Sequence, residues 1–460
     1  MGPDGGIVIG VGFLAGVFVL AAAPDEGARK ALIAEGSRLF VREWTPGDPS
    51  AHGGDGLGPV YNATSCVACH HQGGVGGAGP ADKNVEQVSA LGRLAATEAI
   101  QADLRKLHPG FDKAATLPLH RHGLDEGYDR WRAAMLKDNV RPDEVQYEAA
   151  QNGSRSRRDI ARAATLDNRS LRLNLPIKHG GASIARTEIN TPALFGSGCV
   201  DAIPAQAIEK QVGNRLADFP EIKGRVSRLA DGRLGRFGWK AQAATLDDFV
   251  LTACAVELGL EVPGRSQSLS PAHPDETAPG LDLSRRECDA LTTFVRDLPR
   301  PVAQRPETEI DMAAIRTGAR LFRMVGCAVC HVPSLGGVDG LFSDLLLHDM
   351  GVELSSDGSY YPDTSLPPRR ATPWAADDPA RRPPASTEWR TPPLWGLRDS
   401  GPYLHDGRAH DIEVAIALHG GEAAATSKRY FDLSRSERFA VERLLKSLAS
   451  PSSSGAGEHP

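Results

Sequence analysis

Cys66-Val67-Ala68-Cys69-His70 and Cys327-Ala328-Val329-Cys330-His331 are two copies of the pattern C-x-x-C-H. In this pattern each cysteine adds across a haem vinyl group as a thioether, and the histidine ligates the iron. A zinc site needs a second Cys/His pair nearby, and a redox C-x-x-C needs a βαβ context; the sequence indicates neither. It therefore predicts two covalently bound haem c groups, with His70 and His331 as proximal ligands.

Similar segments surround both motifs. The pattern Gly-x-x-Leu-Phe stands before the first motif at 36–40 and before the second at 318–322. Each half ends on a Ser-x-x-Glu capping box, at Ser284 and Ser434, followed by an apolar helix. A leading helix, C-x-x-C-H, a loop and a packed terminal helix make a cytochrome c domain. The sequence thus predicts a mainly α fold with two such domains in tandem.

The repeat also sets the expected boundaries. We expect a signal peptide or anchor over 1–24, an N-terminal cytochrome c domain over 25–300, a C-terminal one over 301–450 and a disordered tail over 451–460. The N-terminal domain is longer because it holds a loop-rich insertion at about 111–240. Within that insertion, the basic stretch 154–162 is most simply a solvated loop or helix face.

Composition narrows the function classes. The 460 residues carry a net charge of −6, which gives no basic footprint for nucleic acid. The apolar run Ile7–Ala23 predicts either a cleaved secretory signal or an uncleaved membrane anchor, and hence a periplasmic or other extracytoplasmic location. Three of the seven cysteines lie outside the motifs, and no pairing among them can be deduced: Cys199, Cys254 and Cys288.

The chain resembles the bacterial di-haem oxidoreductase family, within the di-haem cytochrome c peroxidase group. The matching stretches are Ala63–Pro80, Asn190–Gly196, Gly235–Lys240, Ser343–Gly351 and Trp389–Ala423. The resemblance implies a peroxidase-like enzyme whose C-terminal haem accepts electrons from a small donor protein or small-molecule reductant. Those electrons pass to an N-terminal haem that reduces hydrogen peroxide. The alternatives are an electron-transfer cytochrome without catalysis and a di-haem oxygenase that uses dioxygen.

The sixth ligand decides what each haem does, because only a five-coordinate iron has room for peroxide or dioxygen. In the group that this chain resembles, the C-terminal ligand lies fourteen residues after the His of His-Asp-Gly. Here that histidine is His405, so the ligand position is His419. Met350 is a second candidate ligand. His405 is a third, although in that group it more often lies beside the haem as a hydrogen-bonding group. His348 is more simply a structural hydrogen-bonding group. Arg390 is expected to pair with a haem propionate.

For the N-terminal haem, the repeat offers no histidine at the matching position, and a loose alignment places Cys254 there. The sixth position is either open or occupied by His120 or His122, with His108 and His179 as further candidates. If it is open, either histidine could act as a distal acid/base, with Arg121 stabilising the leaving hydroxide. The alternative for all three residues is a surface or packed turn.

Two further expectations concern the space between the haems. The resemblance implies a calcium ion held partly by the backbone carbonyls of Ser400 and Pro402, with Asn84 as a third ligand of poorly matching spacing. Three tryptophans are candidates either for an electron relay or for packing against porphyrin: Trp44, Trp239 and Trp395.

Overall fold

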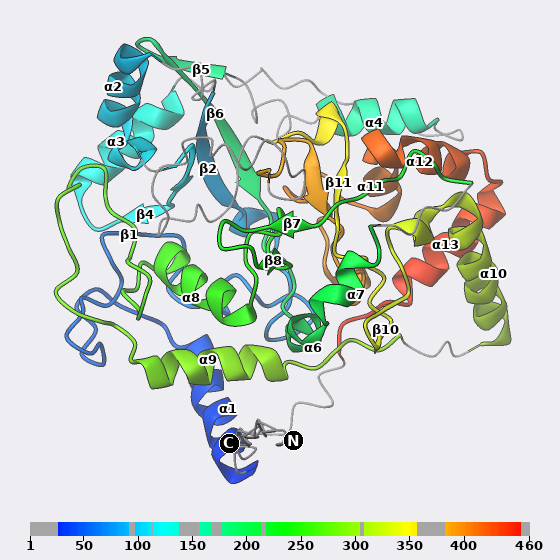
Figure 1. The fold of residues 1–460 in the computed structure, drawn as a ribbon, viewed down its shortest axis with the longest axis horizontal. Helices are drawn as coiled ribbons and strands as arrows, with labels where there is room; N and C mark the ends of the chain where they lie inside the picture. The colour runs from blue at the N-terminus through cyan, green and yellow to red at the C-terminus, as the bar shows by residue number, and fades with distance from the viewer. Residues whose placement is uncertain are drawn as a thin grey trace, which may run out of the picture.

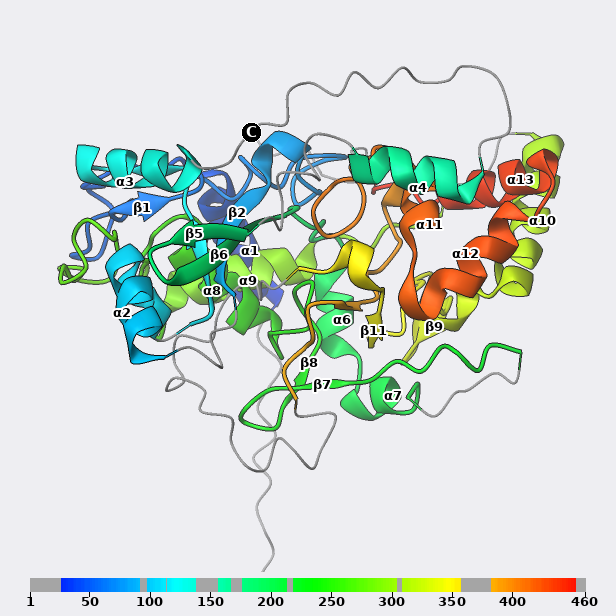
Figure 2. The same ribbon diagram turned by 90° about the horizontal axis from the view of Figure 1, so that it is seen from above.

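The computed structural model describes residues 26–91, 97–112, 114–137, 156–166, 176–212, 218–303, 308–356 and 382–451 (Figures 1 and 2). The expected signal or anchor over 1–24 and the tail beyond 451 lie outside these ranges. Within them, no helix has both the length and the apolar character needed to cross a membrane.

Helices hold more of the described residues than strands do, so the prediction of a mainly helical protein is confirmed. The α-helices are α1 (Glu26–Val41), α2 (Glu98–Leu107), α3 (Glu126–Lys137), α4 (Arg157–Leu166), α6 (Ser197–Ala202), α7 (Ala205–Glu209), α8 (Leu246–Glu257), α9 (Arg285–Asp297), α10 (Glu309–Val325), α11 (Ile412–Leu418), α12 (Ala424–Phe431) and α13 (Arg435–Lys446). Short 3₁₀ turns that bear on the sites are η4 (Cys327–Val329) and η8 (Gly421–Ala423).

Two helix pairs repeat the same crossing. Helix α1 packs on α9, and α10 packs on α13, well apart from the first pair in both views. Both crossings occur at a glycine: a Cβ on Gly36 would lie 2.1 Å from Ala290 O, and one on Gly318 would lie 2.1 Å from Ala440 O. Only glycine allows the backbones to approach so closely. The predicted capping boxes that begin α9 and α13 are both confirmed.

A four-stranded antiparallel sheet in the N-terminal half was not predicted. Its order is β3-β2-β6-β5, formed by β2 (Val85–Ala90), β3 (Thr116–Leu119), β5 (Pro176–His179) and β6 (Ala182–Ile189). Apolar residues of the sheet pack with α2 and Phe111 into a core of their own. Part of the region expected to be loop-rich, about 111–240, is therefore regular structure.

The remaining strands are short. They are β1 (Val60–Tyr61), β4 (His122–Gly123), β7 (Ser227–Arg228), β8 (Leu234–Gly235), β9 (Ser334–Leu335), β10 (Val338–Asp339), β11 (Leu347–Asp349) and β12 (Glu388–Arg390). Strand β11 pairs with β12, and on its other side Leu347 exchanges both backbone hydrogen bonds with Arg225, at 2.8 and 2.9 Å. A segment of the N-terminal half is thus joined to the C-terminal half.

Helix α4 makes a second connection between the halves. It packs against α11 and α12, as Figure 2 shows, and Ile160 is buried among Val414, Ala417 and Leu418. The expectation that 154–162 is simply solvated is therefore wrong for part of this stretch. Arg158 is exposed, but Ile160 faces the core, since one face of a short amphipathic helix can be buried while the other stays in water.

Candidate haem-binding cavities

Each C-x-x-C-H motif lines one of two adjoining cavities. A cavity of about 280 Å³ is lined by the cysteines and histidine of the second motif, and one of about 90 Å³ by those of the first. We call them the C-terminal and N-terminal cavities. Five residues line both and form the wall between them: Asn190, Thr191, Pro192, Gly238 and Trp239.

The two motif histidines have equivalent surroundings. His70 Nδ1 lies 3.2 Å from Gly77 O, and His331 Nδ1 lies 2.9 Å from Phe342 O. Because Nδ1–H donates to a carbonyl, Nε2 is left with its lone pair for a metal. Burial lowers the pKa of both histidines to about 4, so both are neutral at pH 7, the form that ligates iron. These features fit a haem at each motif.

Arg390 gives an independent test of that fit. This buried guanidinium, at the end of β12, lines the C-terminal cavity; Nε donates to Gly238 O at 2.8 Å. Burial lowers its pKa to about 10, which still leaves it charged at pH 7. Among the described residues, no carboxylate lies within ion-pair distance of Arg390, and the Asp344 carboxylate acts on it only from farther away. A buried cation needs an anionic partner, and a haem propionate can supply one.

Three predicted residues of the C-terminal site come together around this cavity: His419, Met350 and His405 all line it. His419 is the C-cap of α11, and its Nδ1 lies 2.7 Å from Ala415 O, which leaves Nε2 available. His405 stacks on Trp389, with ring centroids 3.6 Å apart. Ligation by His419 or Met350 stays a prediction.

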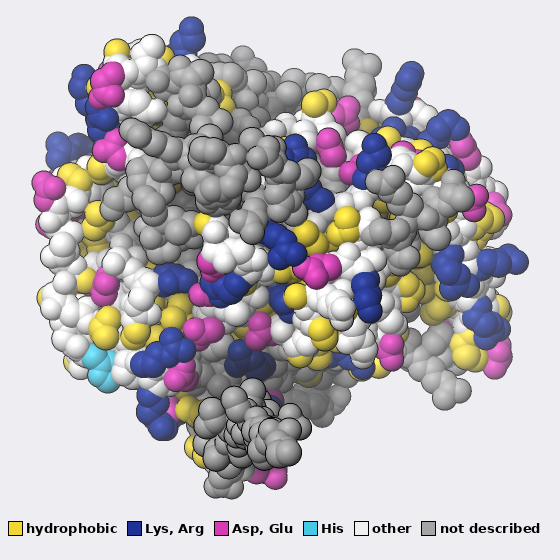
Figure 3. Space-filling view, in the orientation of Figure 1, with side chains coloured by type: hydrophobic (Ala, Val, Ile, Leu, Met, Phe, Trp, Pro, Cys, Tyr) yellow, Lys and Arg dark blue, Asp and Glu magenta, His cyan; other side chains and the backbone are white. Residues whose placement is uncertain are grey.

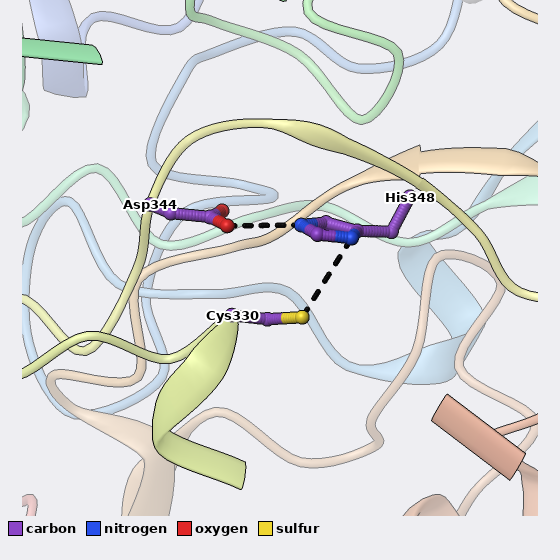
Figure 4. A group of neighbouring side chains, drawn as sticks. All are labelled: Cys330, Asp344 and His348. Atoms are coloured by element: carbon purple, nitrogen blue, oxygen red, sulfur yellow. Dashed lines mark hydrogen bonds and ion pairs between the residues drawn. The ribbon is translucent and has the colours of Figure 1, made fainter. Parts of the chain in front are cut away.

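His348 is held at both ring nitrogens. Nε2 lies 2.9 Å from Asp344 Oδ2, and Nδ1 lies 2.8 Å from Glu422 Oε2 and 3.7 Å from Cys330 Sγ (Figure 4). Cys330, Asp344 and His348 form the one group of metal-ligating side chains found among the described residues. Asp344 and Cys330 lie at opposite ring nitrogens of His348, so the three side chains do not point toward one common ion.

The environment of His348 explains that arrangement. Burial opposes its protonation, but the Asp344 carboxylate raises the pKa of His348 well above its usual value. A protonated imidazole donates at both nitrogens, which matches a carboxylate on each side. We therefore interpret Asp344, His348 and Glu422 as a buried ion-pair triad.

The N-terminal cavity is walled by one face of α8: Phe249, Val250, Ala253, Cys254 and Glu257. Side-chain caps fix the alignment of α8 with α11, because Thr245 caps the first and Asp411 the second. Eight residues after the cap, α11 has His419 and α8 has Ala253. The position matching His419 is therefore Ala253 rather than Cys254, and its methyl group cannot ligate iron.

Glu257 is a site residue that the sequence did not reveal. It lies one helical turn after Ala253 on the same face, and Asn62 Nδ2 donates to its Oε2 at 2.8 Å. A carboxylate in a largely apolar cavity can accept and return a proton. The sequence does hold one clue to Glu257. Once α8 and α11 are aligned by their N-caps, Glu257 lies four residues after the position that matches His419, and hence on the same face of the helix.

The residues predicted to be catalytic lie outside the lining of this cavity. His120 is buried and its Nε2 donates to Val256 O at 2.8 Å; burial lowers its pKa to about 4. The backbone N–H of Arg121 donates to Asn62 Oδ1 at 3.0 Å, and His122 is exposed on β4. His120 thus contacts the residue before Glu257 and Arg121 contacts Asn62, while His122 stacks on Tyr61 with ring centroids 5.2 Å apart. Their catalytic role stays a prediction.

Other predicted residues have varied positions. Trp239 lines both cavities and donates from Nε1 to Asn190 O at 2.9 Å, Trp395 lines the C-terminal cavity, and Trp44 is buried in the main core. Cys199, Cys254 and Cys288 are all free thiols.

The residues expected to hold calcium are partly engaged elsewhere. Ser400 and Pro402 line the C-terminal cavity. Asn84 donates from Nδ2 to Asp406 O at 2.8 Å, and its Oδ1 accepts from Asn190 Nδ2 at 2.9 Å. In this arrangement the Asn84 amide is used by protein partners and does not fit a calcium ligand.

Comparisons with known proteins place the chain in a family. The family model described as "Di-haem oxidoreductase, putative peroxidase" matches residues 193–448, more than half of the chain. The methylamine utilization protein MauG of Methylorubrum extorquens is 26% identical over 270 residues, which cover 53% of this chain and 69% of that protein. The resemblance inferred from the sequence is confirmed.

Two solved structures are more distant. A Kuenenia stuttgartiensis hydrazine synthase pressurised with xenon matches with 19% identity and a TM-score of 0.30, over 57% of this chain and 73% of that chain. A MauG-like protein associated with microbial copper homeostasis matches with 19% identity and a TM-score of 0.29, over 55% of this chain and 91% of that chain.

Proposed function

Because this chain belongs to the di-haem oxidoreductase family, we propose that it is an exported peroxidase-like enzyme with two covalently attached haem c groups. The observation that carries the proposal is the pair of adjoining cavities, each with a partly buried, neutral motif histidine whose Nδ1 is occupied. The repeated glycine crossings of α1 on α9 and α10 on α13 support two tandem cytochrome c units.

In the C-terminal unit, the chain supplies two histidines that can ligate iron, His331 and His419, and one buried cation that can pair with a propionate, Arg390. Each haem, when bound, supplies an iron that exchanges single electrons. With the haem bound, His331 and His419 would both ligate its iron, which would then exchange electrons and leave no position for peroxide. Arg390, which lines the C-terminal cavity, would pair with a haem propionate. A small donor protein or small-molecule reductant supplies the electrons here.

Trp239 is the proposed bridge between the sites. Its indole lines both cavities, and its position is fixed twice: Nε1 donates to Asn190 O, and its carbonyl accepts from Arg390 N at 2.9 Å. A rigid aromatic group between two redox sites shortens the gap that an electron crosses.

In the N-terminal unit, His70 would ligate the haem iron, and the methyl group of Ala253 would leave room for hydrogen peroxide in the cavity. Glu257 would accept a proton from one oxygen of the peroxide and return it to the other oxygen, which leaves as water. With two electrons and two protons, one peroxide yields two waters. Asn62 holds Glu257 Oε2 in place for both transfers.

Export and calcium complete the proposal. The apolar run Ile7–Ala23 supports an extracytoplasmic, most simply periplasmic, enzyme that is either released or anchored. Calcium rests on the family resemblance alone, and no step is assigned to it.

The proposal is tested by assaying the haem-loaded protein with a chemical reductant. We expect two haems per chain that survive denaturation, because thioethers are covalent, and two electrons consumed per hydrogen peroxide. Haem lost on denaturation contradicts the covalent attachment. Two retained haems without peroxide reduction identify an electron-transfer cytochrome instead. Dioxygen consumption in place of peroxide reduction identifies an oxygenase.

A further inference from the structure

The turn after α11 fixes where His419 can lie. His419 ends this short helix, and the chain then passes through η8 into α12. The ring is tied to its own helix through Nδ1 and Ala415 O. The His419 carbonyl has no partner further along the helix, because the last carbonyls of a helix lack intrahelical donors. What holds this carbonyl therefore helps to hold the ring.

The donor to that carbonyl comes from the N-terminal half of the chain. Arg157, the first residue of α4, donates from Nη2 to His419 O at 3.0 Å and from Nε to Ser427 Oγ at 2.9 Å. Ser427 Oγ in turn donates to Ile416 O at 2.6 Å. One guanidinium thus joins both ends of the turn. A cation at a helix C-terminus is also favoured by the helix dipole.

A second contact from the N-terminal half supports the middle of the turn. The backbone N–H groups of Lys223 and Gly224 donate to Glu422 Oε2, at 2.8 and 3.1 Å. The same carboxylate oxygen pairs with His348. The turn that carries His419 is therefore held from outside its own unit at its start, middle and end.

We propose that Arg157 is a positioning residue for His419: α4, inserted in the N-terminal half, holds the distal ligand of the C-terminal haem in place. The inference rests on the assignment of His419 under the proposed function. It gives the inserted segment a role, since displacing α4 weakens the sixth ligand at the other haem. Arg157 touches no haem atom and acts only through the backbone of His419.

The test compares four variants of the haem-loaded protein by electron paramagnetic resonance in the diferric state. His419→Ala removes the ligand and should convert one low-spin haem to high-spin. Arg157→Ala should give the same high-spin signal in part, and should raise the apparent affinity for added imidazole about tenfold. Arg157→Lys keeps the positive charge but cannot make both hydrogen bonds with one planar group. It should therefore recover only part of the low-spin signal that Arg157→Ala loses.

Arg158→Ala is the matched control, because Arg158 is the next residue of the same helix and is exposed. An unchanged spectrum and imidazole affinity in Arg157→Ala, or an equal change in Arg158→Ala, would overturn the positioning role. An unchanged spectrum in His419→Ala would instead overturn the ligand assignment itself. If Arg157→Ala does not fold, Ser427→Ala breaks the other end of the bridge and should also raise the imidazole affinity; no change there overturns the proposal.

Discussion

Replacing Glu257 with glutamine removes a proton acceptor while keeping the shape of the N-terminal cavity. Asn62 still has an oxygen to bond, because the glutamine amide can present its carbonyl where Oε2 now lies. Proton transfer by a positioned side chain contributes about 10²–10⁴ in rate. We therefore expect Glu257→Gln to slow the reaction with peroxide by that factor, which raises the barrier by roughly 3–5 kcal/mol.

The assay is stopped-flow absorbance of the N-terminal haem against peroxide concentration, which gives a second-order rate constant. Glu276→Gln is the matched control, since Glu276 is exposed and outside the cavity lining, and its rate should stay within about twofold of wild type. The resting spectrum of Glu257→Gln should match wild type, because Glu257 is not assigned as a ligand. If Glu257→Gln reacts as fast as wild type, or Glu276→Gln slows the reaction equally, Glu257 is not the proton acceptor.

Three further results are expected. Burial would raise the pKa of Glu388, but its hydrogen bond to Arg225 brings that pKa down to about 2. A carboxyl whose pKa is lowered by folding stabilises the fold at any pH above its pKa in the unfolded chain. Glu388→Gln should therefore lower the free energy of unfolding by roughly 3 kcal/mol at pH 7. That difference in denaturant unfolding should shrink below about pH 4.5 and vanish near pH 2; a constant difference would contradict it. Gly318→Val, whose Cβ meets Ala440 O, should cost roughly 1–3 kcal/mol or more in thermal unfolding, and an unchanged melting temperature refutes the close crossing. Trp239→Phe should slow electron transfer between the haems after rapid reduction of the C-terminal one, and an unchanged rate excludes Trp239 as the bridge.

Local signals explain what the sequence could predict. A C-x-x-C-H motif is five residues long and its chemistry depends on that spacing alone. A capping box is equally local, so the starts of α9 and α13 follow from Ser284 and Ser434 and their glutamates. The family resemblance rested on such stretches, and the family match confirms it.

The remaining features depend on contacts between distant residues. Glu257 looks like any acidic residue at a helix end until Asn62, almost two hundred positions earlier, is placed beside it. Arg157 lies in a basic stretch that suggests solvent, yet its partner is the carbonyl of His419. The sheet that pairs β2 with β6 joins segments about a hundred residues apart, on either side of the helices α2 and α3. No local pattern specifies such pairings.

The central claim is that one haem has two axial histidines and the other keeps an open face. Electron paramagnetic resonance of the resting, diferric, haem-loaded protein tests it most directly. The account predicts one low-spin signal, from the site of His331 and His419, and one high-spin signal, from the site of His70 and Ala253. Two low-spin signals that persist after one-electron reduction would contradict the open site, and with it the proposed reaction of peroxide.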